Sequence, residues 1–430
     1  MTAALLYFLA LIILLFVRVP VAFAMMVVGI IGFGQYVNWT GTLSMVGRVA
    51  YDTAQSSELS VIPLFVLMGS FITRAGLANE LYSTANTWIG HRRGGLAMAT
   101  ILSCGGFAAV CGSSVATAAT MAKVAMPPMR SFGYADSLAT GAISAGGTLG
   151  ILIPPSVILV IYGILTSTDI GALFIAGIIP GILGIVGYNI AISISTRINP
   201  EIGPRGVATT WPEKFRSLGQ VWGVLLLFLL VIGGIYTGWF TPTEAAGVGA
   251  CGAFFFALGR KRLTWRVLFE ILADAAQTTA MLFFILIGAL IFSNLMNETG
   301  MPETLGAWVT GIDAHPLVVV AAIMLIYVGL GAVLDSLAMI LLTIPLFFPI
   351  VTGLNLDPIW FGIIVVVVTE ISLITPPVGM NIFVLNTVLP DVQTGTIFRG
   401  VTPFWMADLV RLALLVLFPP ITLFLPSLMG

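Results

Sequence analysis

A pair of similar interrupted segments, 222 residues apart, constrains the fold of this chain more than any other feature. Each copy contains, in the same order, a small polar pair, a proline and a stretch with two adjacent prolines. Proline removes a backbone hydrogen bond and breaks a helix, so each copy predicts an interrupted helix. The matched positions are Ser114 with Ser336, Pro127 with Pro349, Pro154-Pro155 with Pro376-Pro377, and Asp169 with Asp391.

Both interruptions lie within a very apolar chain. Of its 430 residues, 59% are hydrophobic and 8% are charged, whereas soluble proteins carry about 25% charged residues. The composition therefore predicts a polytopic membrane protein. Lipid tolerates interrupted backbone only where it is buried in protein or lines a cavity. Two interrupted helices at matching places in two halves indicate the binding site of a secondary transporter.

Composition and motifs also argue against several other classes. The net charge of -1 gives no reason to expect a nucleic-acid partner. The sequence contains neither a nucleophile–base pair typical of an enzyme nor a P-loop, which leaves an ion gradient as the energy source. An odd number of cysteines without metal-ligand spacing indicates buried small residues rather than disulfides. These cysteines are Cys104, Cys111 and Cys251.

Apolar runs of about 17–25 residues predict the spanning helices. Two longer runs, 135–165 and 357–388, contain the proline breaks. Two others, 95–128 and 316–353, turn near small polar residues and predict re-entrant hairpins, with a simple pair of crossings as the alternative for each. The simple spans are expected at 3–17, 20–37, 59–75, 171–196, 219–240, 243–259, 276–296 and 402–426.

Charged residues predict the orientation of these segments. The basic clusters at 91–93, 197–216 and 260–266 are expected in the cytoplasm by the positive-inside rule. An even number of crossings must then separate the first two clusters, so 95–128 returns to its own side. The same reasoning makes 316–353 a hairpin that enters from the outside. The result is an inverted repeat with ten crossings, two hairpins and both termini outside.

The expected fold is therefore an all-α polytopic membrane protein with an inverted structural repeat, two re-entrant hairpins and two broken helices. It divides into N-terminal helices (1–58), repeat 1 (59–197), a cytoplasmic linker with a connecting helix pair (198–275), and repeat 2 (276–430).

The broken segments offer groups that can bind ions. Backbone carbonyls freed by glycine and proline, together with small hydroxyls, suit a hard cation such as sodium. Freed amides at the N-termini of half-helices suit a carboxylate. Each hairpin tip is expected to face a break. The tips are Gly112-Ser113-Ser114 and 331–336, and the breaks are 146–155 and 369–377.

Asp335 and Glu370 are the acids that lie deepest in apolar sequence. An intramembrane carboxylate is costly and marks a functional site by default. Asp335 either binds the cation or caps its hairpin helix. Glu370 either neutralises a cation or holds Asn381 or backbone groups in place. Asp169 and Asp391 are expected to cap the helices that follow the breaks.

Long motifs in this chain resemble one family, the large membrane subunit (DctM/SiaM-like) of tripartite ATP-independent periplasmic (TRAP) transporters. The resemblance covers essentially the whole chain. The matching motifs are GSSVATAATMAKVAMPPM (112–129), GYADSLATGAISAGGTLGILIPPSVILVIYG (133–163), DIGALFIAGIIPG (169–181), FTPTEAAGVGA (240–250) and LITPPVGMNIFVLN (373–386).

The resemblance implies a multi-pass protein of the bacterial inner membrane that works with two partners. One is a small four-helix membrane subunit, and the other is a periplasmic substrate-binding protein that delivers an organic acid such as a C4-dicarboxylate or a sialic acid. A sodium gradient would drive uptake. A transport domain of hairpins and broken helices would move against a scaffold as an elevator, with 77–92 and 298–313 as connecting arms or plain loops. The scaffold is expected to contain 3–37, 59–75, 171–196, 219–259, 276–296 and 402–426.

The resemblance also implies two Na+ sites and a set of residues for transport. The first Na+ site is expected at Ser113, Ser114, Gly147, Thr148 and Gly150, and the second at Asp335, Ser336, Thr369 and Thr375. The candidates for substrate contact or transport are Ser113, Ser114, Asp335, Glu370, Pro154, Pro155, Pro376 and Pro377.

Three other interpretations compete with a TRAP subunit. The first is a self-sufficient Na+/carboxylate symporter with the same fold but without a binding protein. The second is a channel or passive scaffold, which predicts a continuous polar stripe rather than two polar breaks. The third is an intramembrane hydrolase, which lacks a catalytic constellation in this sequence.

Overall fold

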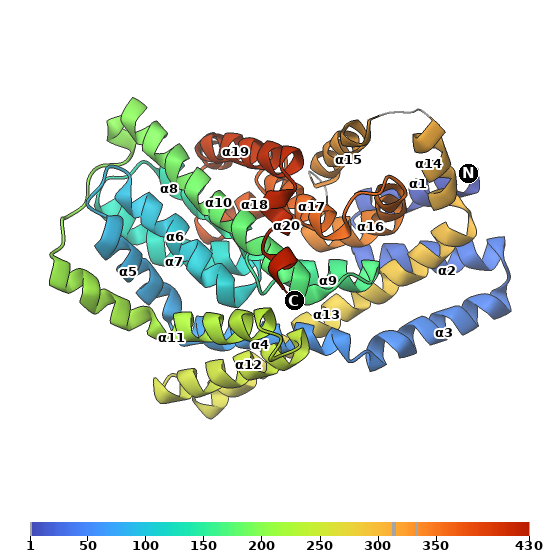
Figure 1. The fold of residues 1–430 in the computed structure, drawn as a ribbon, viewed down its shortest axis with the longest axis horizontal. Coiled ribbons are helices and arrows are strands. Elements are labelled where there is room, and N and C mark those ends of the chain that lie inside the picture. Colours follow the sequence, from blue (N-terminus) through green and yellow to red (C-terminus); the bar gives the residue numbers. More distant parts are fainter. Residues whose placement is uncertain (1, 312–314, 332–333, 430) are drawn as a thin grey trace.

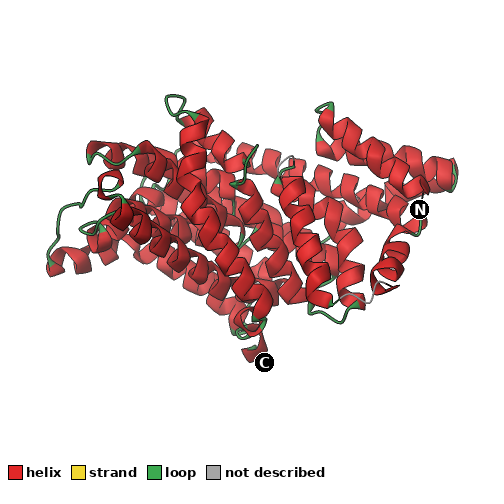
Figure 2. Ribbon diagram, turned by 90° about the horizontal axis from the view of Figure 1, so that it is seen from above, coloured by secondary structure: helices red, strands yellow, loops and turns green. Residues whose placement is uncertain are grey.

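The structure, a computed structural model, describes residues 2–311, 315–331 and 334–429. Every named element in these ranges is a helix (Figures 1 and 2). The all-α prediction is therefore confirmed. Two groups of helices can be distinguished by their packing, one built around the long helix α13 and the other around the broken helices.

The first group combines N-terminal helices with helices from the middle of the chain. Helix α13 packs along α2 and α4, and α12 packs against α4 and α11. In Figure 1, α3, α4, α11, α12 and α13 run across the lower part of the molecule, and α1 and α2 lie at its right. The bounds are α1 (Thr2–Phe16), α2 (Val21–Tyr36), α3 (Trp39–Gln55), η1 (Glu58–Ser60), α4 (Val61–Arg74), α11 (Trp211–Tyr236), α12 (Pro242–Gly259) and α13 (Trp265–Glu298).

Helix α3 was not expected from the sequence. It is amphipathic, with Met45 buried and Leu43 72% exposed, and its mixed polarity hides it from a search for apolar runs. The helix bends by 57° into η1 and α4. Asn38 begins it by accepting a hydrogen bond from the Gly41 amide.

Each predicted hairpin segment contains two helices. In the first, α6 (Gly95–Cys111) meets α7 (Ser114–Ser131) at Gly112, whose φ of +64° suits glycine. In the second, α15 (Pro316–Gly331) precedes α16 (Ser336–Gly353). Part of the second predicted tip, residues 332–333, lies outside the described residues.

Both predicted interruptions fall at the proline pairs. The first separates α8 (Asp136–Thr148) and η2 (Leu149–Ile151) from α9 (Val157–Thr166), and the second separates α17 (Pro358–Leu373) from α18 (Met380–Val388). The Pro154-Pro155 and Pro376-Pro377 peptide bonds are both cis. The first pair is buried, whereas the second pair is exposed.

The repeat extends beyond the hairpins and breaks. Adding 222 to the bounds of α7 gives the bounds of α16. The same offset brings α5 (Leu77–Ile89) onto α14 (Met301–Gly311), and α10 (Ile170–Ile198) onto α19 (Thr394–Leu417), to within a few residues. The expected arms are therefore helices rather than plain loops over their described residues, while 312–313 of the second arm lies outside them.

Helices α10 and α19 depart from the expected scaffold. They pack against each other and against the broken helices, α19 on α8 and α10 on α17. The predicted span 402–426 is also displaced, because α19 starts at Thr394 and stops at Leu417 before Pro419 and Pro420. The remaining short elements are α20 (Pro420–Leu423), η3 (Pro200–Ile202) and η4 (Pro426–Leu428).

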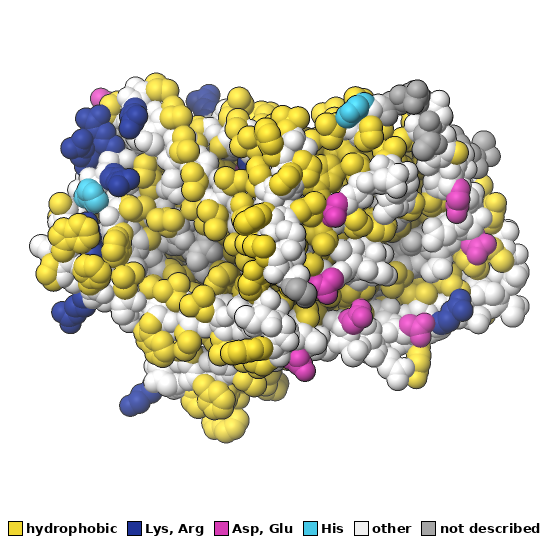
Figure 3. Space-filling view, in the orientation of Figure 1, with side chains coloured by type: hydrophobic (Ala, Val, Ile, Leu, Met, Phe, Trp, Pro, Cys, Tyr) yellow, Lys and Arg dark blue, Asp and Glu magenta, His cyan; other side chains and the backbone are white. Residues whose placement is uncertain are grey.

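Five helices in the described part of the chain are long and apolar enough to cross a membrane, and the bent pair α3–α4 adds a sixth as one span. On the face in Figure 3, Lys and Arg gather towards the end of the molecule that holds α5 and the start of α11, while Asp and Glu lie mainly over the other half. The count of ten crossings stays a prediction. The five helices are α10, α11, α13, α16 and α19.

Candidate functional site

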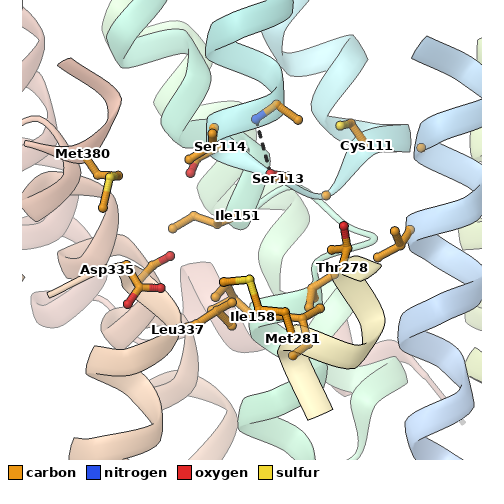
Figure 4. Close-up of a pocket in the computed structure, with 18 of the residues that line it drawn as sticks. Cys111, Ser113, Ser114, Ile151, Ile158, Thr278, Met281, Asp335, Leu337 and Met380 are labelled. Atoms are coloured by element: carbon orange, nitrogen blue, oxygen red, sulfur yellow. Dashed lines mark hydrogen bonds between the residues drawn. The ribbon is translucent and has the colours of Figure 1, made fainter. Parts of the chain in front are cut away.

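A cavity of about 800 Å³ brings the two hairpin tips together. Ser113 and Ser114 line it from the first tip, and Asp335 and Ser336 line it from the second. Figure 4 shows the Ser114 and Asp335 side chains on either side of Ile151, which belongs to the first break. Four of the predicted site residues, separated by more than 200 residues in the chain, therefore share one space.

The first tip packs directly on the first break. A Cβ atom at Gly150 would lie 2.7 Å from the Ser113 carbonyl oxygen and 3.0 Å from Thr117 Oγ1. The Ser113 hydroxyl accepts a hydrogen bond from the Ala116 amide, drawn as a dashed line in Figure 4. A Cβ atom at Gly112 would lie 2.6 Å from the Pro155 carbonyl oxygen. The glycines thus permit an oxygen-rich contact between tip and break.

The second tip packs on the second break in the same manner. Gly331 contacts the side chain of Ser372, and 372 is the position equivalent to Gly150 in the repeat. Asp335 occupies the N-cap position of α16, and the backbone amides of Leu337 and Ala338 face its carboxylate. The carboxylate lines the cavity, so cation binding by Asp335 stays a prediction beside the capping alternative.

Most of the other predicted site residues lie behind the cavity rather than on its wall. Thr369 and Thr375 donate their hydroxyls to the carbonyls of Val365 and Ile371. Thr375 also accepts a hydrogen bond from Trp405 Nε1 at 3.0 Å. The residues outside the cavity lining are Gly147, Thr148, Gly150, Thr369, Glu370, Thr375, Pro154, Pro155, Pro376 and Pro377.

Glu370 is fully buried and pairs with Arg411, with 2.5 Å between Oε2 and the guanidinium. Arg411 Nη2 also lies 2.8 Å from Asp408 Oδ1. Asn381, one of the partners considered for Glu370, instead donates to the Ser144 carbonyl at 3.2 Å. Glu370 therefore belongs to a buried ion-pair cluster and not to the cavity wall.

The two aspartates that follow the breaks differ in role. Asp169 caps α10 by accepting from the Ala172 amide at 2.6 Å, as predicted. The prediction for Asp391 is wrong, because Gln393 holds the N-cap position of α19 and Asp391 pairs with Arg130 at 2.6 Å. Arg130 also binds Asp136, and this hydrogen bond raises the pKa of the guanidinium. Arg130, Asp136 and Asp391 thus link the C-terminal end of α7 to α8 and to the α18–α19 turn.

The opposite wall of the cavity comes from the α13 group. Arg18 lies in the turn between α1 and α2 and forms no ion pair within the described residues. Arg74, at the end of α4, lies 3.5 Å from Glu270 and 4.0 Å from Asp274. Asp274 and Thr278 line the cavity from α13. Two guanidinium groups thus share this space with the hairpin tips.

Comparison with known proteins places the chain in a family. The model of the DctM component of tripartite ATP-independent periplasmic transporters matches residues 8–421. The chain belongs to this DctM family. It is 39% identical to a C4-dicarboxylate TRAP transporter large permease from Pseudomonas aeruginosa over 88% of each chain. It is 33% identical to a sialic acid TRAP transporter large permease from Vibrio cholerae over 96% of each.

The fold also occurs in a distant transporter. The YdaH transporter of Alcanivorax borkumensis, described as having an unusual topology, aligns with a TM-score of 0.63 at 16% identity over 89% of this chain and 90% of that chain. As a DctM permease with several long apolar helices, the chain is a multi-pass protein of the bacterial inner membrane.

Sequence reasoning missed several polar residues of this DctM permease. Asp408 and Arg411 stand one helical turn apart inside the predicted span 402–426, and this pairing of opposite charges in an apolar run was a usable signal. Tyr188 and Arg18 carried no such signal, because only the folded chain brings Tyr188 to Asp408 and Arg18 to the hairpin tips.

Proposed function

We propose that this DctM permease performs sodium-coupled uptake of a carboxylate substrate, a C4-dicarboxylate, a sialic acid or a related organic acid, by an elevator mechanism. The observation that carries the proposal is the shared cavity, in which Ser113, Ser114, Asp335 and Ser336 face two guanidinium groups. Sodium prefers oxygen ligands, and carboxylates prefer guanidinium groups and backbone amides.

Two Na+ sites are proposed where each tip meets its break. The first uses oxygens of Ser113 and Ser114 together with backbone of 147–150, and the second uses Asp335, Ser336 and backbone of 369–375. Crowding of the Ser113 carbonyl and the Thr117 hydroxyl around Gly150 supports the first site. The position of the Asp335 carboxylate on the cavity wall supports the second.

The moving body is proposed to comprise both hairpins, both broken helices, and α10 and α19, which pack on them. The α13 group, with α1, α2, α4, α11 and α12, would form the stationary scaffold. The helical arms α5 and α14 occupy equivalent positions in the two repeats and would connect the two bodies. This assignment transfers α10 and α19 from the expected scaffold to the moving body.

The proposed partners are a small four-helix membrane subunit and a periplasmic substrate-binding protein. Membership of a family named for tripartite transporters supports this assembly. The relatives' names include different acids, so a ligand screen on the binding protein would choose the substrate.

The proposal is tested by radiolabelled uptake into proteoliposomes that contain this chain and the small subunit. The binding protein is added outside, with and without an inward sodium gradient. We expect uptake only when all three proteins and sodium are present. Uptake by this chain alone would favour the self-sufficient symporter, and sodium-independent equilibration would contradict coupling.

A further inference from the structure

The polar cluster around Arg411 reaches both broken helices. Tyr188 of α10 donates its hydroxyl to Asp408 Oδ2 at 2.7 Å and lies 3.3 Å from Thr148 Oγ1. Arg411 then joins Asp408 to Glu370. A continuous series of polar contacts thus runs from Thr148 in α8 to Glu370 in α17.

Thr148 and Glu370 are equivalent positions of the repeat, because they are 222 residues apart. Each stands two residues before the residue that contacts its own hairpin tip, which is Gly150 in the first break and Ser372 in the second. The cluster therefore connects the same point of both breaks, within the backbone stretches proposed for the two Na+ sites.

The cluster is enclosed by the surrounding protein. Thr148, Tyr188, Glu370 and Asp408 are 0% exposed, and Arg411 is 4% exposed. The guanidinium lies directly against Gly184 of α10, where a Cβ atom would collide with Nη1. Because buried charges are costly unless they are paired, a shift of one partner must be followed by the others.

We propose that the Thr148–Tyr188–Asp408–Arg411–Glu370 cluster couples the two breaks, so that ion binding at one hairpin tip favours ion binding at the other. Arg411 and Tyr188 act as positioning residues that touch neither ion nor substrate. The inference rests on the proposed sodium coupling. Coupling of two sites by a shared element appears as cooperativity in the binding of the ligand.

The test compares Tyr188→Phe with the wild type. This substitution removes one hydroxyl and retains the ring that packs against Phe404. The matched control is Tyr327→Phe, which removes a buried hydroxyl whose hydrogen-bond partner among the described residues is Thr343 of the second hairpin. Uptake in proteoliposomes is measured against sodium concentration, and the melting temperature of the purified protein is measured over the same range.

We expect a Hill coefficient near two for the wild type and for Tyr327→Phe, and a value near one for Tyr188→Phe, because two coupled sites limit the coefficient to about two. The sodium-induced rise in melting temperature should lose its sigmoidal form in the same variant. Gly184→Ala, which displaces the guanidinium, should resemble Tyr188→Phe.

Three results would overturn the inference. One is a Tyr188→Phe variant with a lower melting temperature but an unchanged Hill coefficient, as a purely structural role predicts. Another is a wild-type Hill coefficient of one, and the third is an equal loss of cooperativity in Tyr327→Phe. A wild type with no sodium dependence would instead refute the proposed function itself.

Discussion

Asp335 and Asp169 occupy the same type of position with different results. Both stand at the N-cap of a helix, but only Asp335 lines the cavity. The Asp335 carboxylate at the cavity wall can meet a ligand, whereas the Asp169 carboxylate accepts a hydrogen bond from the Ala172 amide. The comparison separates a structural aspartate from a candidate ion ligand within one chain.

Replacing Asp335 with alanine should reduce sodium-dependent uptake about 100-fold, because losing a charged ligand costs about 3 kcal/mol. Asp169→Ala is the matched control. It should cost about 1 kcal/mol of stability through the lost cap and leave the sodium dependence unchanged. The measurement is uptake as a function of sodium concentration with equal amounts of each permease. Normal uptake by Asp335→Ala would contradict its assignment.

Arg18 is the guanidinium of the cavity wall without an ion pair in the described residues. Substitution by glutamine should raise the substrate concentration for half-maximal uptake about tenfold, equivalent to about 1.4 kcal/mol. Arg48→Gln, on α3 and away from the cavity, provides a control with the same change of charge. If both variants raise the substrate concentration for half-maximal uptake equally, Arg18 acts through the overall charge of the protein and does not contact the acid.

At the scale of elements, the glycines set how closely each tip approaches its break. A methyl group at Gly150 would lie 2.7 Å from the Ser113 carbonyl oxygen, which must then move. Gly150→Ala should therefore weaken apparent sodium affinity and destabilise the protein by about 1–3 kcal/mol, as overpacking does.

The control is Gly353→Ala at the end of α16, where an added Cβ atom meets nothing within 4 Å. Thermal unfolding and the sodium dependence of uptake check both variants. A Gly150→Ala permease with an unchanged sodium dependence would show that the tip–break contact is only packing.

The positions of hairpins and breaks could be predicted because their signals are local. Proline pairs, glycines and small hydroxyls interrupt an apolar run wherever they occur, and the helices end at those residues. Helix α3 could not be predicted in this way because it mixes polar and apolar residues. The packing of α10 and α19 could not be predicted either, because the sequence of an apolar span does not show which helices it will contact.

The candidate site could be predicted only in part for a related reason. Ser113, Ser114, Asp335 and Ser336 could be predicted because they lie at the hairpin tips, which local sequence signals mark. Contacts such as Tyr188 with Asp408 join residues 220 positions apart. A single sequence carries no distance information at that range.

At the scale of the whole molecule, the cavity has a defined side. It reaches the α1–α2 turn, the end of α4 and residues 271–282 in the N-terminal half of α13, which the basic clusters place towards the cytoplasm. On the orientation that the charges predict, we propose that this arrangement is inward-facing.

Cys111 at the first tip lines this cavity, whereas Cys104 is buried. In a Cys251→Ser background, a membrane-impermeant maleimide should modify Cys111 in inside-out vesicles and spare it in right-side-out vesicles. Substrate with sodium should slow the modification. Labelling from the outside alone would reverse the orientation or the access state.

The cavity walls belong to two bodies that are proposed to slide past each other. A natural substrate must release one wall when the moving body departs. An acid long enough to hold Arg18 on one wall and Asp335, through a cationic arm, on the other would keep both bodies in place. Such a bridging molecule would be an inhibitor that the permease binds but does not carry, and its potency should grow with the number of contacts on both walls.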